Sequence, residues 1–260
     1  MFIDTHCHLD ASEFGNTQAE LVQAASRAGV SCIVQLSVER ANFETVHTLC
    51  ERFPACAPTY GIHPMYTENA SPADLAVLRD YLEKQQPVAV GEIGLDFFVD
   101  GFDQARQEYF FVEQLKLARE FDLPVLLHIR RAQDTILKFL RKHKVRGGIA
   151  HAFNGSRQQA EEFIKLGFKL GFGGAMTYSR ALRLRGLAAT LPLEAIVLET
   201  DAPDIPPDFL ERGAPNKPEY LPRIAQILAD LRSMTHDEIA LTTTRNVLSV
   251  LPNISRHISI

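Results

Sequence analysis

The feature that most constrains the fold is a regular alternation of short apolar runs with longer amphipathic stretches. Runs such as "SCIVQLS", "VAVGEIGLD" and "LPVLLHIR" have the length of β-strands. Stretches such as "QARQEYFFVEQLKLAREF" and "SRQQAEEFIKLG" between them have the 3.6-residue period of helices. Alternating strands and helices are typical of a parallel β-sheet. The pattern therefore predicts an α/β protein.

The number of apolar runs narrows the choice of architecture. They are "FIDTH", "CIVQL", "CAPTYGIH", "VAVGEI", "PVLLHI", "GGIAHA", "FKLGF" and "AIVLET". About eight strands over roughly 200 residues fit a (β/α)8 TIM barrel. A doubly wound sheet is the alternative, but no G-x-G-x-x-G follows any run, and "GFGG" lacks the spacing of that fingerprint.

Helix boundaries and the end of the chain complete the expected organisation. Ser71 and Ser156 stand where N-caps are expected, and "PNKPEYLPRIAQILADLR" predicts a proline-led eighth helix. "HDEIALTTTRNVLSVL" predicts an extra C-terminal helix, and "PNISRHISI" predicts a loose tail. No linker or low-complexity segment divides the chain, so we expect one domain over residues 1–260.

Composition excludes several classes of protein. A hydrophobic content of 46% can fill one large core, and a formal net charge of −5 argues against bulk affinity for nucleic acid or anionic membranes, although a local basic patch could still serve either. The four cysteines have no C-x-x-C spacing, which indicates reduced thiols. No apolar run approaches membrane-spanning length, and a first strand at residue 2 leaves no room for a cleavable signal. We expect a cytoplasmic protein, and no feature indicates an obligate protein partner or a particular oligomeric state.

The first strand carries two histidines in "FIDTHCHLD". Residues two apart on a strand share a face, so we expect Asp4, His6 and His8 to point the same way, with Phe2 deeper on that face and Cys7 packed on the opposite one. Paired imidazoles on a rigid element suit a borderline-soft divalent metal. The alternative is that each histidine only forms hydrogen bonds within the core.

Polar side chains at the ends of other expected strands strengthen the metal hypothesis. In a parallel barrel the carboxyl ends of all strands meet on one face, so residues far apart in the sequence converge there. Each residue alone has a structural explanation, as a bonded core histidine or as a carboxylate that neutralises an arginine. Together, six metal-competent side chains are expected on one rim: His6, His8, Glu92, His128, His151 and Asp201.

This number of ligands suggests two ions rather than one. A single zinc needs three or four protein ligands, and a carboxylate can span two metals where an imidazole cannot. Glu92 is the natural bridge. We expect one ion to be held by His6, His8, Glu92 and Asp201, and the other by Glu92, His128 and His151. Imidazole and carboxylate ligands serve several metals, so zinc, manganese and magnesium all stay open.

The chain resembles the TatD family of metal-dependent hydrolases. The motifs "FIDTHCH", "GIHP", "GEIGLD", "LLHIR", "HAFNGS", "GFGGAMTY", "LETDAP" and "PNKPEYL" occur in that family's order and spacing, from residue 2 to about residue 250. "ETDAPD" and "GEIGLDFF" are most similar to its bacterial YjjV branch. The resemblance implies a distorted amidohydrolase-like (β/α)8 barrel, a two-metal site and DNase activity. The family's ligand positions fall on the six residues named above, and a further family histidine matches His63.

Three positions depart from the family's pattern. Ile129 replaces a small residue after His128, but its parity directs it away from the site. Asn154 stands where serine is common, which could alter substrate preference. Pro215 stands where an arginine is expected, and Lys217 could supply that positive charge instead.

The resemblance and the ligand set together indicate a chemistry. A two-metal phosphodiesterase, exonuclease-like and acting on DNA, would use a metal-bound hydroxide as its nucleophile. Asp201 is the expected general base beside Glu92, while His63 and Arg130 could bind phosphate oxygens or the leaving group. Asp4 and Glu199 lie one layer deeper and could either orient ligands or serve the fold alone.

Two other functions are compatible with the same residues. Hydrolysis of an amide or ester, including an aminoacyl ester on tRNA, occurs or is proposed in related two-metal barrels. Many of these bridge their metals with a modified lysine on the fourth strand, where this chain has Glu92 and no lysine. A metal-binding protein without catalysis is the third possibility, which the expected base and Arg130 disfavour.

The sequence gives weaker signals for a substrate surface. Several arginines near strand ends could bind an anionic substrate or could simply form a solvated helix surface. Several aromatic residues there could stack on bases or could pack in barrel loops. The arginines are Arg157, Arg180, Arg183 and Arg185, and the aromatic residues are Tyr66, Phe97, Phe98 and Tyr178.

Overall fold

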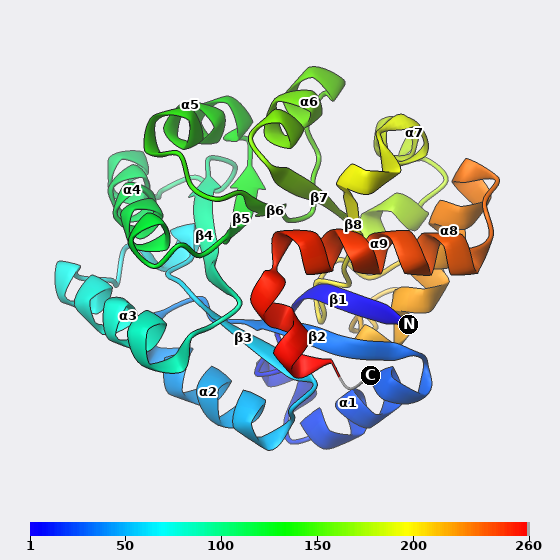
Figure 1. Cartoon of the computed structure of the whole chain (residues 1–260), viewed down its shortest axis with the longest axis horizontal. Coiled ribbons are helices and arrows are strands. Elements are labelled where there is room, and N and C mark those ends of the chain that lie inside the picture. Colours follow the sequence, from blue (N-terminus) through cyan, green and yellow to red (C-terminus); the bar gives the residue numbers. More distant parts are fainter. Residues whose placement is uncertain (259–260) are drawn as a thin grey trace.

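Eight parallel strands form one sheet in which each strand pairs with the next along the chain (Figure 1). The computed structural model describes residues 1–258. Its strands are β1 (Phe2–Cys7), β2 (Val30–Leu36), β3 (Cys56–Tyr60), β4 (Ala89–Asp96), β5 (Val125–Arg130), β6 (Gly148–Ala150), β7 (Phe168–Phe172) and β8 (Ile196–Leu198).

The sheet closes where the end of β1 meets the segment after β8. Asp201 N donates to the carbonyl of His6 over 2.9 Å, and His8 N donates to the carbonyl of Ala202 over 2.8 Å. Cys7 and Ala202 form a parallel bridge between these hydrogen bonds. The prediction of a (β/α)8 TIM barrel is confirmed, and the closing seam lies among candidate metal ligands.

The helices surround the barrel (Figure 1). Ser156 Oγ accepts a hydrogen bond from Gln159 N over 3.1 Å, and Ser71 forms a capping box with Asp74, so both predicted N-caps are confirmed. The helices are α1 (Gln18–Arg27), α2 (Phe43–Arg52), α3 (Pro72–Gln85), α4 (Gln104–Glu120), α5 (Gln133–His143), α6 (Arg157–Lys165), α7 (Leu182–Thr190), α8 (Leu221–Arg232) and α9 (His236–Val250).

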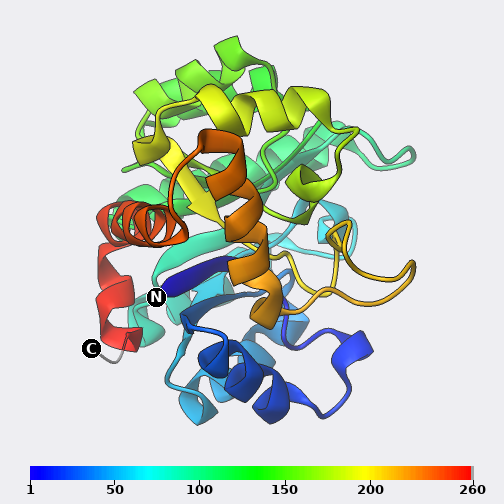
Figure 2. The same cartoon turned by 90° about the vertical axis from the view of Figure 1, so that its right-hand side faces the viewer.

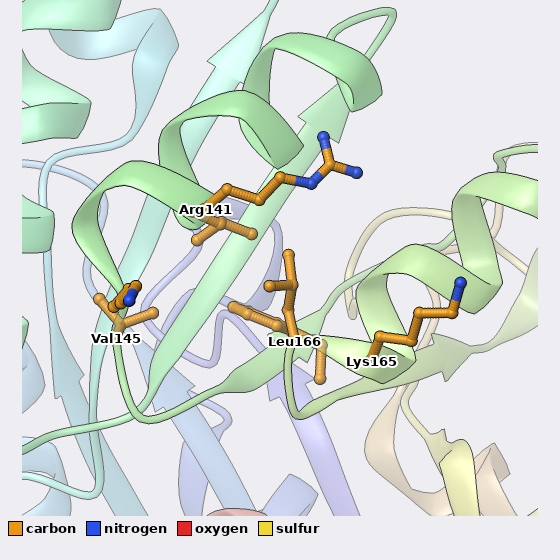
Figure 3. Close-up of a pocket in the computed structure, with 7 residues that line it drawn as sticks. Arg141, Val145, Lys165 and Leu166 are labelled. Carbon is orange, nitrogen blue, oxygen red and sulfur yellow. The ribbon is translucent and has the colours of Figure 1, made fainter.

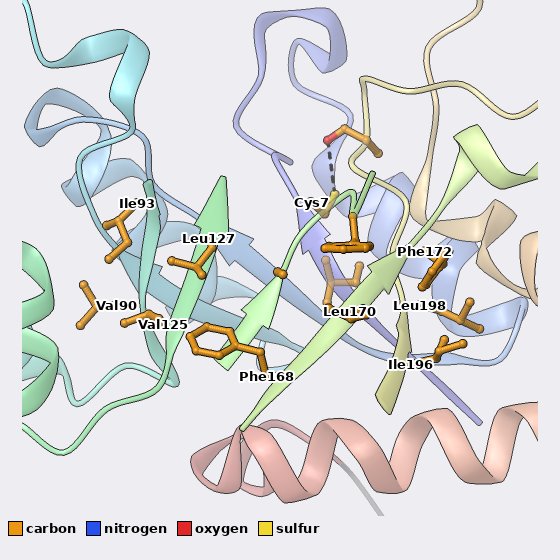
Figure 4. Packing of buried hydrophobic residues seen from close by; sticks show 14 of the residues in the cluster. Cys7, Val90, Ile93, Val125, Leu127, Phe168, Leu170, Phe172, Ile196 and Leu198 are labelled. Atoms are coloured by element: carbon orange, nitrogen blue, oxygen red, sulfur yellow. Dashed lines mark hydrogen bonds between the residues drawn. The ribbon is translucent and has the colours of Figure 1, made fainter. Parts of the chain in front are cut away.

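Buried apolar side chains form two clusters. The outer cluster packs alternate strand residues such as Val90, Leu127 and Leu198 against the helices (Figure 4). The inner cluster joins the opposite faces of the strands, as at Val34 and Leu126, with residues of α9 and of the 3-10 segment after it. Only the interior of a closed barrel brings those strand faces together.

The extra C-terminal helix covers the amino ends of the strands. Asn246 Nδ2 on α9 donates to the carbonyls of Leu193 and Ile196 over 2.8 and 2.7 Å, at the start of β8. Thr244 Oγ1 donates to the carbonyl of Met1 over 3.0 Å, just before β1. This end of the barrel is therefore closed, and polar groups inside it can meet water only at the carboxyl end.

The predicted loose tail is wrong over Pro252–His257. These residues form a 3-10 helix, and Ile254 is fully buried in the inner cluster because the barrel's amino end offers it apolar surface. Residues 259–260 of the expected tail lie outside the described residues. Within residues 1–258, no helix is both long and apolar enough to cross a membrane.

Register shifts interrupt strict alternation between β1 and β2 and between β4 and β5, and two of them matter for the site. On β1, Asp4 pairs with Ile33 and Cys7 with Gln35, so three steps on β1 match two on β2. The bulge reverses parity, and Phe2 lies in the outer cluster together with Cys7. The expectation for Cys7 is confirmed, whereas the expectation that Phe2 shares the face of His6 is wrong.

The second bulge is on β4. Val90 pairs with Val125 and Ile93 with Leu127, so an advance of three residues on β4 matches an advance of two on β5. Gly91 and Glu92 lie within this bulge. Glu92 was expected to close this strand, but β4 continues to Asp96. The bulge therefore directs Glu92 inward from the middle of a strand.

Candidate metal centre

Glu92 lies at the centre of the polar cluster, with each carboxylate oxygen facing a different pair of imidazoles. Oε2 lies 3.2 Å from His6 Nε2 and 3.6 Å from His8 Nε2. Oε1 lies 3.1 Å from His128 Nδ1 and 3.6 Å from His63 Nε2. Burial alone would raise the pKa of Glu92, but the surrounding histidines hold it well below its usual range. The group is an ionised carboxylate.

Asp201 occupies the opposite side of the same cluster. Its Oδ1 lies 3.6 Å from His6 Nε2 and 3.8 Å from His8 Nε2, and its Oδ2 lies 3.4 Å from His151 Nε2. Burial would raise the pKa of Asp201, but His151 lowers it. The backbone has φ +59°, a left-handed conformation that aspartate tolerates better than most residues. The barrel seam, through the hydrogen bond to His6, holds this conformation in place.

Asp4 forms hydrogen bonds to both sides of the seam between β1 and the segment after β8. Its Oδ1 accepts from His6 N over 3.3 Å and from Thr200 N over 2.9 Å, and its Oδ2 accepts from Thr200 Oγ1 over 2.5 Å. Burial raises the pKa of Asp4 to about 7. Asp4 thus ties the backbone of His6 to the segment that carries Asp201.

Two further carboxylates hold the outer nitrogens of the histidines. His151 Nδ1 lies 3.1 Å from Glu199 Oε1, and His128 Nε2 lies 3.0 Å from Asp96 Oδ2. A carboxylate at one ring nitrogen fixes the proton there and leaves the other nitrogen's lone pair free for a metal. Burial would lower the pKa of His151, but Glu199 and Asp201 raise it well above its usual range, and the same negative charges favour a bound cation.

Asp96 was missed by the sequence reasoning, whereas Glu199 was considered. The available signal was a carboxylate at the end of "GEIGLD", which closes β4. The glycines of "GFGG" also acquire a role: a Cβ on Gly171 would lie 2.2 Å from Glu199 Oε2. Only glycine leaves room for that carboxylate beside His151.

His63 differs from the other histidines in its hydrogen bonding. It precedes the 3-10 segment Pro64–Tyr66, and its Nδ1 accepts from Met65 N over 3.2 Å. The neutral ring therefore carries its proton on Nε2, the atom that faces Glu92. Burial, reinforced by the neighbouring His128, lowers the pKa of His63 to about 3. His63 is a neutral hydrogen-bond donor pointing into the cluster.

The spacing of these donors fits divalent cations. Ligand atoms about 2.1 Å from a tetrahedral ion lie about 3.4 Å from one another. Potential ligand atoms lie within 4.8 Å of one another in three overlapping groups, which are His6 with His8 and Glu92, His63 with Glu92 and His128, and His6 with His151 and Glu199. Five of the six predicted ligands and His63 belong to these groups, while Asp201 lies outside them but within 3.4–3.8 Å of His151, His6 and His8.

Arg130 is not among them. Its exposed guanidinium lies over the ring of Phe98, with Cζ 3.8 Å from the ring centroid. Among residues 1–258, no carboxylate oxygen lies within 4.0 Å of this guanidinium. Arg130 thus stands on the rim, as the last residue of β5.

A separate cavity of about 430 Å³ lies between α5 and α6 (Figure 3). It is lined by apolar and basic side chains, including Leu140, Arg141, Lys165 and Phe168. Phe168 begins β7, so this cavity is at the amino end of the barrel, away from the histidine cluster. It supplies no histidine or carboxylate to hold a metal.

Known proteins resemble this chain over almost its whole length. The model of the family described as TatD related DNase matches residues 3–252. The chain belongs to the TatD family. The metal-dependent hydrolase YjjV of Escherichia coli K12 is 43% identical over 252 residues, which cover 96% of this chain and 97% of YjjV. The crystal structure of that TatD homologue matches with a TM-score of 0.93. This TatD-family chain is a metal-dependent hydrolase.

A second relative has a more specific name. The 3'-5' ssDNA/RNA exonuclease TatD of Klebsiella pneumoniae is 34% identical over 250 residues, covering 94% of this chain and 95% of that protein. A TatD-family hydrolase from Entamoeba histolytica, 22% identical, has the same fold with a TM-score of 0.85 over 96% of this chain and 97% of its own.

Of the departures from the TatD pattern, Asn154 and Pro215 are exposed in loops, whereas Ile129 packs against the outer cluster, away from the site as expected. Asn154 Oδ1 accepts from Arg183 Nη2 over 2.5 Å, so the asparagine anchors the start of α7. Lys217 Nζ lies 3.9 Å from Glu219 Oε1, and Asn216 Nδ2 donates to the carbonyl of Thr200 over 2.6 Å. The long loop after β8 is therefore anchored near Asp201. Figure 2 shows it projecting on the same side of the molecule as the loop after β4.

Proposed function

We propose that this TatD-family hydrolase is a two-metal phosphodiesterase that cleaves DNA, with exonuclease-like action at strand ends. The observation that supports it is the position of Glu92, whose two oxygens face His6 and His8 on one side and His128 and His63 on the other. A carboxylate so placed suits a bridge between two cations. A bridging lysine on the fourth strand, as in many amide-cleaving barrels, has no counterpart here.

The contacts of two imidazoles distinguish a metal ligand from a hydrogen-bond donor. In this proposal one ion binds His6, His8, Glu92 and Asp201, and the other binds Glu92, His128 and His151. His151 Nδ1 lies 3.1 Å from Glu199 Oε1, and this negative charge favours a proton on Nδ1, which would leave Nε2 for a metal. His63 has its proton on Nε2, because Nδ1 accepts from the backbone. His63 Nε2 lies 3.6 Å from Glu92 Oε1, whereas His151 has no such contact with Glu92. Because Nε2 carries the proton, His63 is nevertheless suited to donate to a phosphate oxygen rather than to bind a metal.

The protein groups then have distinct roles in phosphodiester hydrolysis. Two divalent ions, when bound, lower the pKa of water and stabilise the attacking and leaving oxygens of an in-line displacement. Asp201 is the general base and accepts the proton of the attacking water at a carboxylate oxygen. His63 donates from Nε2 to a phosphate oxygen, and Arg130 reaches the substrate from the rim.

Parallel turnover assays test this function. Metal-loaded wild type should cleave fluorescent single-stranded DNA, while Glu92→Ala and Asp201→Ala, purified identically, should not. Equal cleavage by all three would indicate a contaminating nuclease and overturn the mechanism. The wild type should also be assayed with aminoacyl-tRNA, a small phosphodiester and an amide in zinc, manganese and magnesium. Faster turnover of the aminoacyl ester or the amide than of DNA would replace phosphodiester hydrolysis as the function.

A further inference from the structure

The rim beside the metal centre has an unusual aromatic residue. Phe98 follows β4 and is 42% exposed. Two guanidinium groups lie over its ring, with Arg130 Cζ 3.8 Å and Arg131 Cζ 4.5 Å from the centroid. Cation–π contact shields the apolar ring from water while both charges remain at the surface.

Neither arginine has an acidic partner in the part of the chain that the structure describes. Some exposed arginines of this protein pair with carboxylates, as Arg141 does with Glu162 and Arg146 with Asp122, whereas others in that part, such as Arg180 and Arg245, do not. Over residues 1–258, no carboxylate oxygen comes within 4.0 Å of the guanidinium of Arg130 or Arg131. Two positive charges at the mouth of the site are therefore available to an anion, and planar guanidinium groups bind phosphate well.

The turn that carries Phe98 is fixed by a residue of the metal centre. Asp96 Oδ1 accepts from Phe98 N over 2.9 Å and from Val99 N over 3.3 Å, while its Oδ2 faces His128 Nε2 at 3.0 Å. The ladder between β4 and β5 continues from Phe97 N to the carbonyl of Arg130 over 2.8 Å. Phe98 is thus positioned by the same carboxylate that orients a proposed metal ligand.

The other aromatic candidates near the rim are less available. Phe97 packs against the core, and Tyr178 donates its hydroxyl to the carbonyl of Pro206 over 3.0 Å. Tyr66 is 37% exposed, but its ring stands edge-on to His63 at 6.1 Å. Phe98 is the aromatic side chain with both an exposed ring and unpaired cations beside it in the described part of the chain.

We propose that Phe98, Arg130 and Arg131 form a nucleotide subsite adjoining the metal centre. A base of the substrate stacks on Phe98 in place of a guanidinium, and the arginines turn to the phosphate beside the bond to be cleaved. Stacking on an aromatic face tolerates any base, which suits a nuclease without sequence preference. This inference rests on the proposed function, because it assigns the subsite to a polynucleotide substrate.

Two variants and a matched control test the subsite. Phe98→Ala removes the stacking surface, and Arg131→Gln removes one charge. Tyr109→Ala is the control, because Tyr109 is an equally exposed aromatic residue (44%) on α4. With a short oligothymidylate, Phe98→Ala should raise KM about tenfold and leave kcat within about twofold. Phe98→Tyr should restore KM. With bis-p-nitrophenyl phosphate, which has no neighbouring base, the change in KM should be much smaller.

Binding without turnover gives an independent readout. Fluorescence anisotropy of a labelled oligothymidylate, measured in chelator, should show the same loss of affinity for Phe98→Ala. Arg131→Gln should reduce the slope of log Kd against log salt by about 1. Unchanged KM, Kd and salt slope in both variants, relative to Tyr109→Ala, would overturn the subsite. A wild type that binds DNA through Phe98 yet does not cleave it would instead overturn the proposed function and support the subsite.

Discussion

His6 Nε2 and Glu92 Oε2 lie 3.2 Å apart, although each residue sits in a β-bulge of a different strand. Their strands, β1 and β4, are not neighbours in the sheet, so the contact spans the barrel interior. A bulge redirects a side chain that strict alternation would send elsewhere. The two irregularities together create the centre of the candidate site.

Replacement of two histidines should separate metal binding from substrate binding. His151→Ala should lose about one of two metal equivalents, because its Nε2 lone pair is the proposed ligand. His63→Ala should keep both equivalents and lose activity about 100-fold, because it removes only a hydrogen-bond donor. Elemental analysis after purification without chelator measures the difference. The reverse pattern, with metal lost from His63→Ala alone, would assign His63 as the ligand.

Asp96→Asn should weaken metal binding without unfolding the turn. The asparagine oxygen can still accept from Phe98 N, but an amide NH₂ facing His128 Nε2 favours a proton on Nδ1 and removes the lone pair that faces Glu92. Loss of such a carboxylate typically lowers metal affinity about 10- to 100-fold. Competitive titration with a chromophoric chelator measures this change. Asp100→Asn, on the same loop and exposed, is the control; equal affinities of the two variants would argue against the role of Asp96.

Gly171→Ala should destabilise the fold and loosen the metal centre. The new Cβ would lie 2.2 Å from Glu199 Oε2, so Glu199 must move away from His151. Overpacking of this kind costs about 1–3 kcal/mol of unfolding free energy. Gly186→Ala on α7 is the matched control, since nothing lies within 4 Å of its added Cβ and alanine favours a helix by about 0.5–1 kcal/mol. Denaturant unfolding should therefore shift in opposite directions; a stabilised Gly171→Ala would contradict the packing.

Asp74→Asn should show a pH-dependent loss of stability. Asp74 accepts from Ser71 N over 2.7 Å and from Arg40 Nη1 over 3.0 Å. Although burial raises the pKa of Asp74, these hydrogen bonds lower it overall. A lowered folded-state pKa contributes stability above the unfolded-state pKa, and this contribution is lost as pH falls through the folded-state value.

The size of that loss follows from helix capping. At pH 7, Asp74→Asn should be less stable than the wild type by about 1 kcal/mol. Urea unfolding at neutral pH and near pH 2 measures both states. A difference that persists or grows at the acidic pH would show that the carboxylate charge of Asp74 has no part in the effect.

Much of the architecture was predictable from the sequence because the signals are local. Each apolar run and amphipathic stretch reports its own backbone periodicity, and each cap at Ser71 or Ser156 acts within one helical turn. Strand order follows from alternation, since short parallel crossovers leave few topologies. The convergence of His6 and Asp201 on one rim follows from the same rule, because parallel strands end on one face.

The rest was decided by contacts that exist only in the closed barrel. No local pattern predicts that bulges turn Phe2 outward and Glu92 inward, since a bulge is fixed by pairing with the neighbouring strand. Ile254 is buried because the barrel's amino end offers it an apolar surface. Asp96 at the end of β4 matters because it contacts His128 on the neighbouring strand β5. The sequence by itself determined which residues reach the rim. The tertiary structure decided which ring nitrogen of each histidine faces a carboxylate, because such contacts depend on distances of a few ångströms that sequence spacing does not specify.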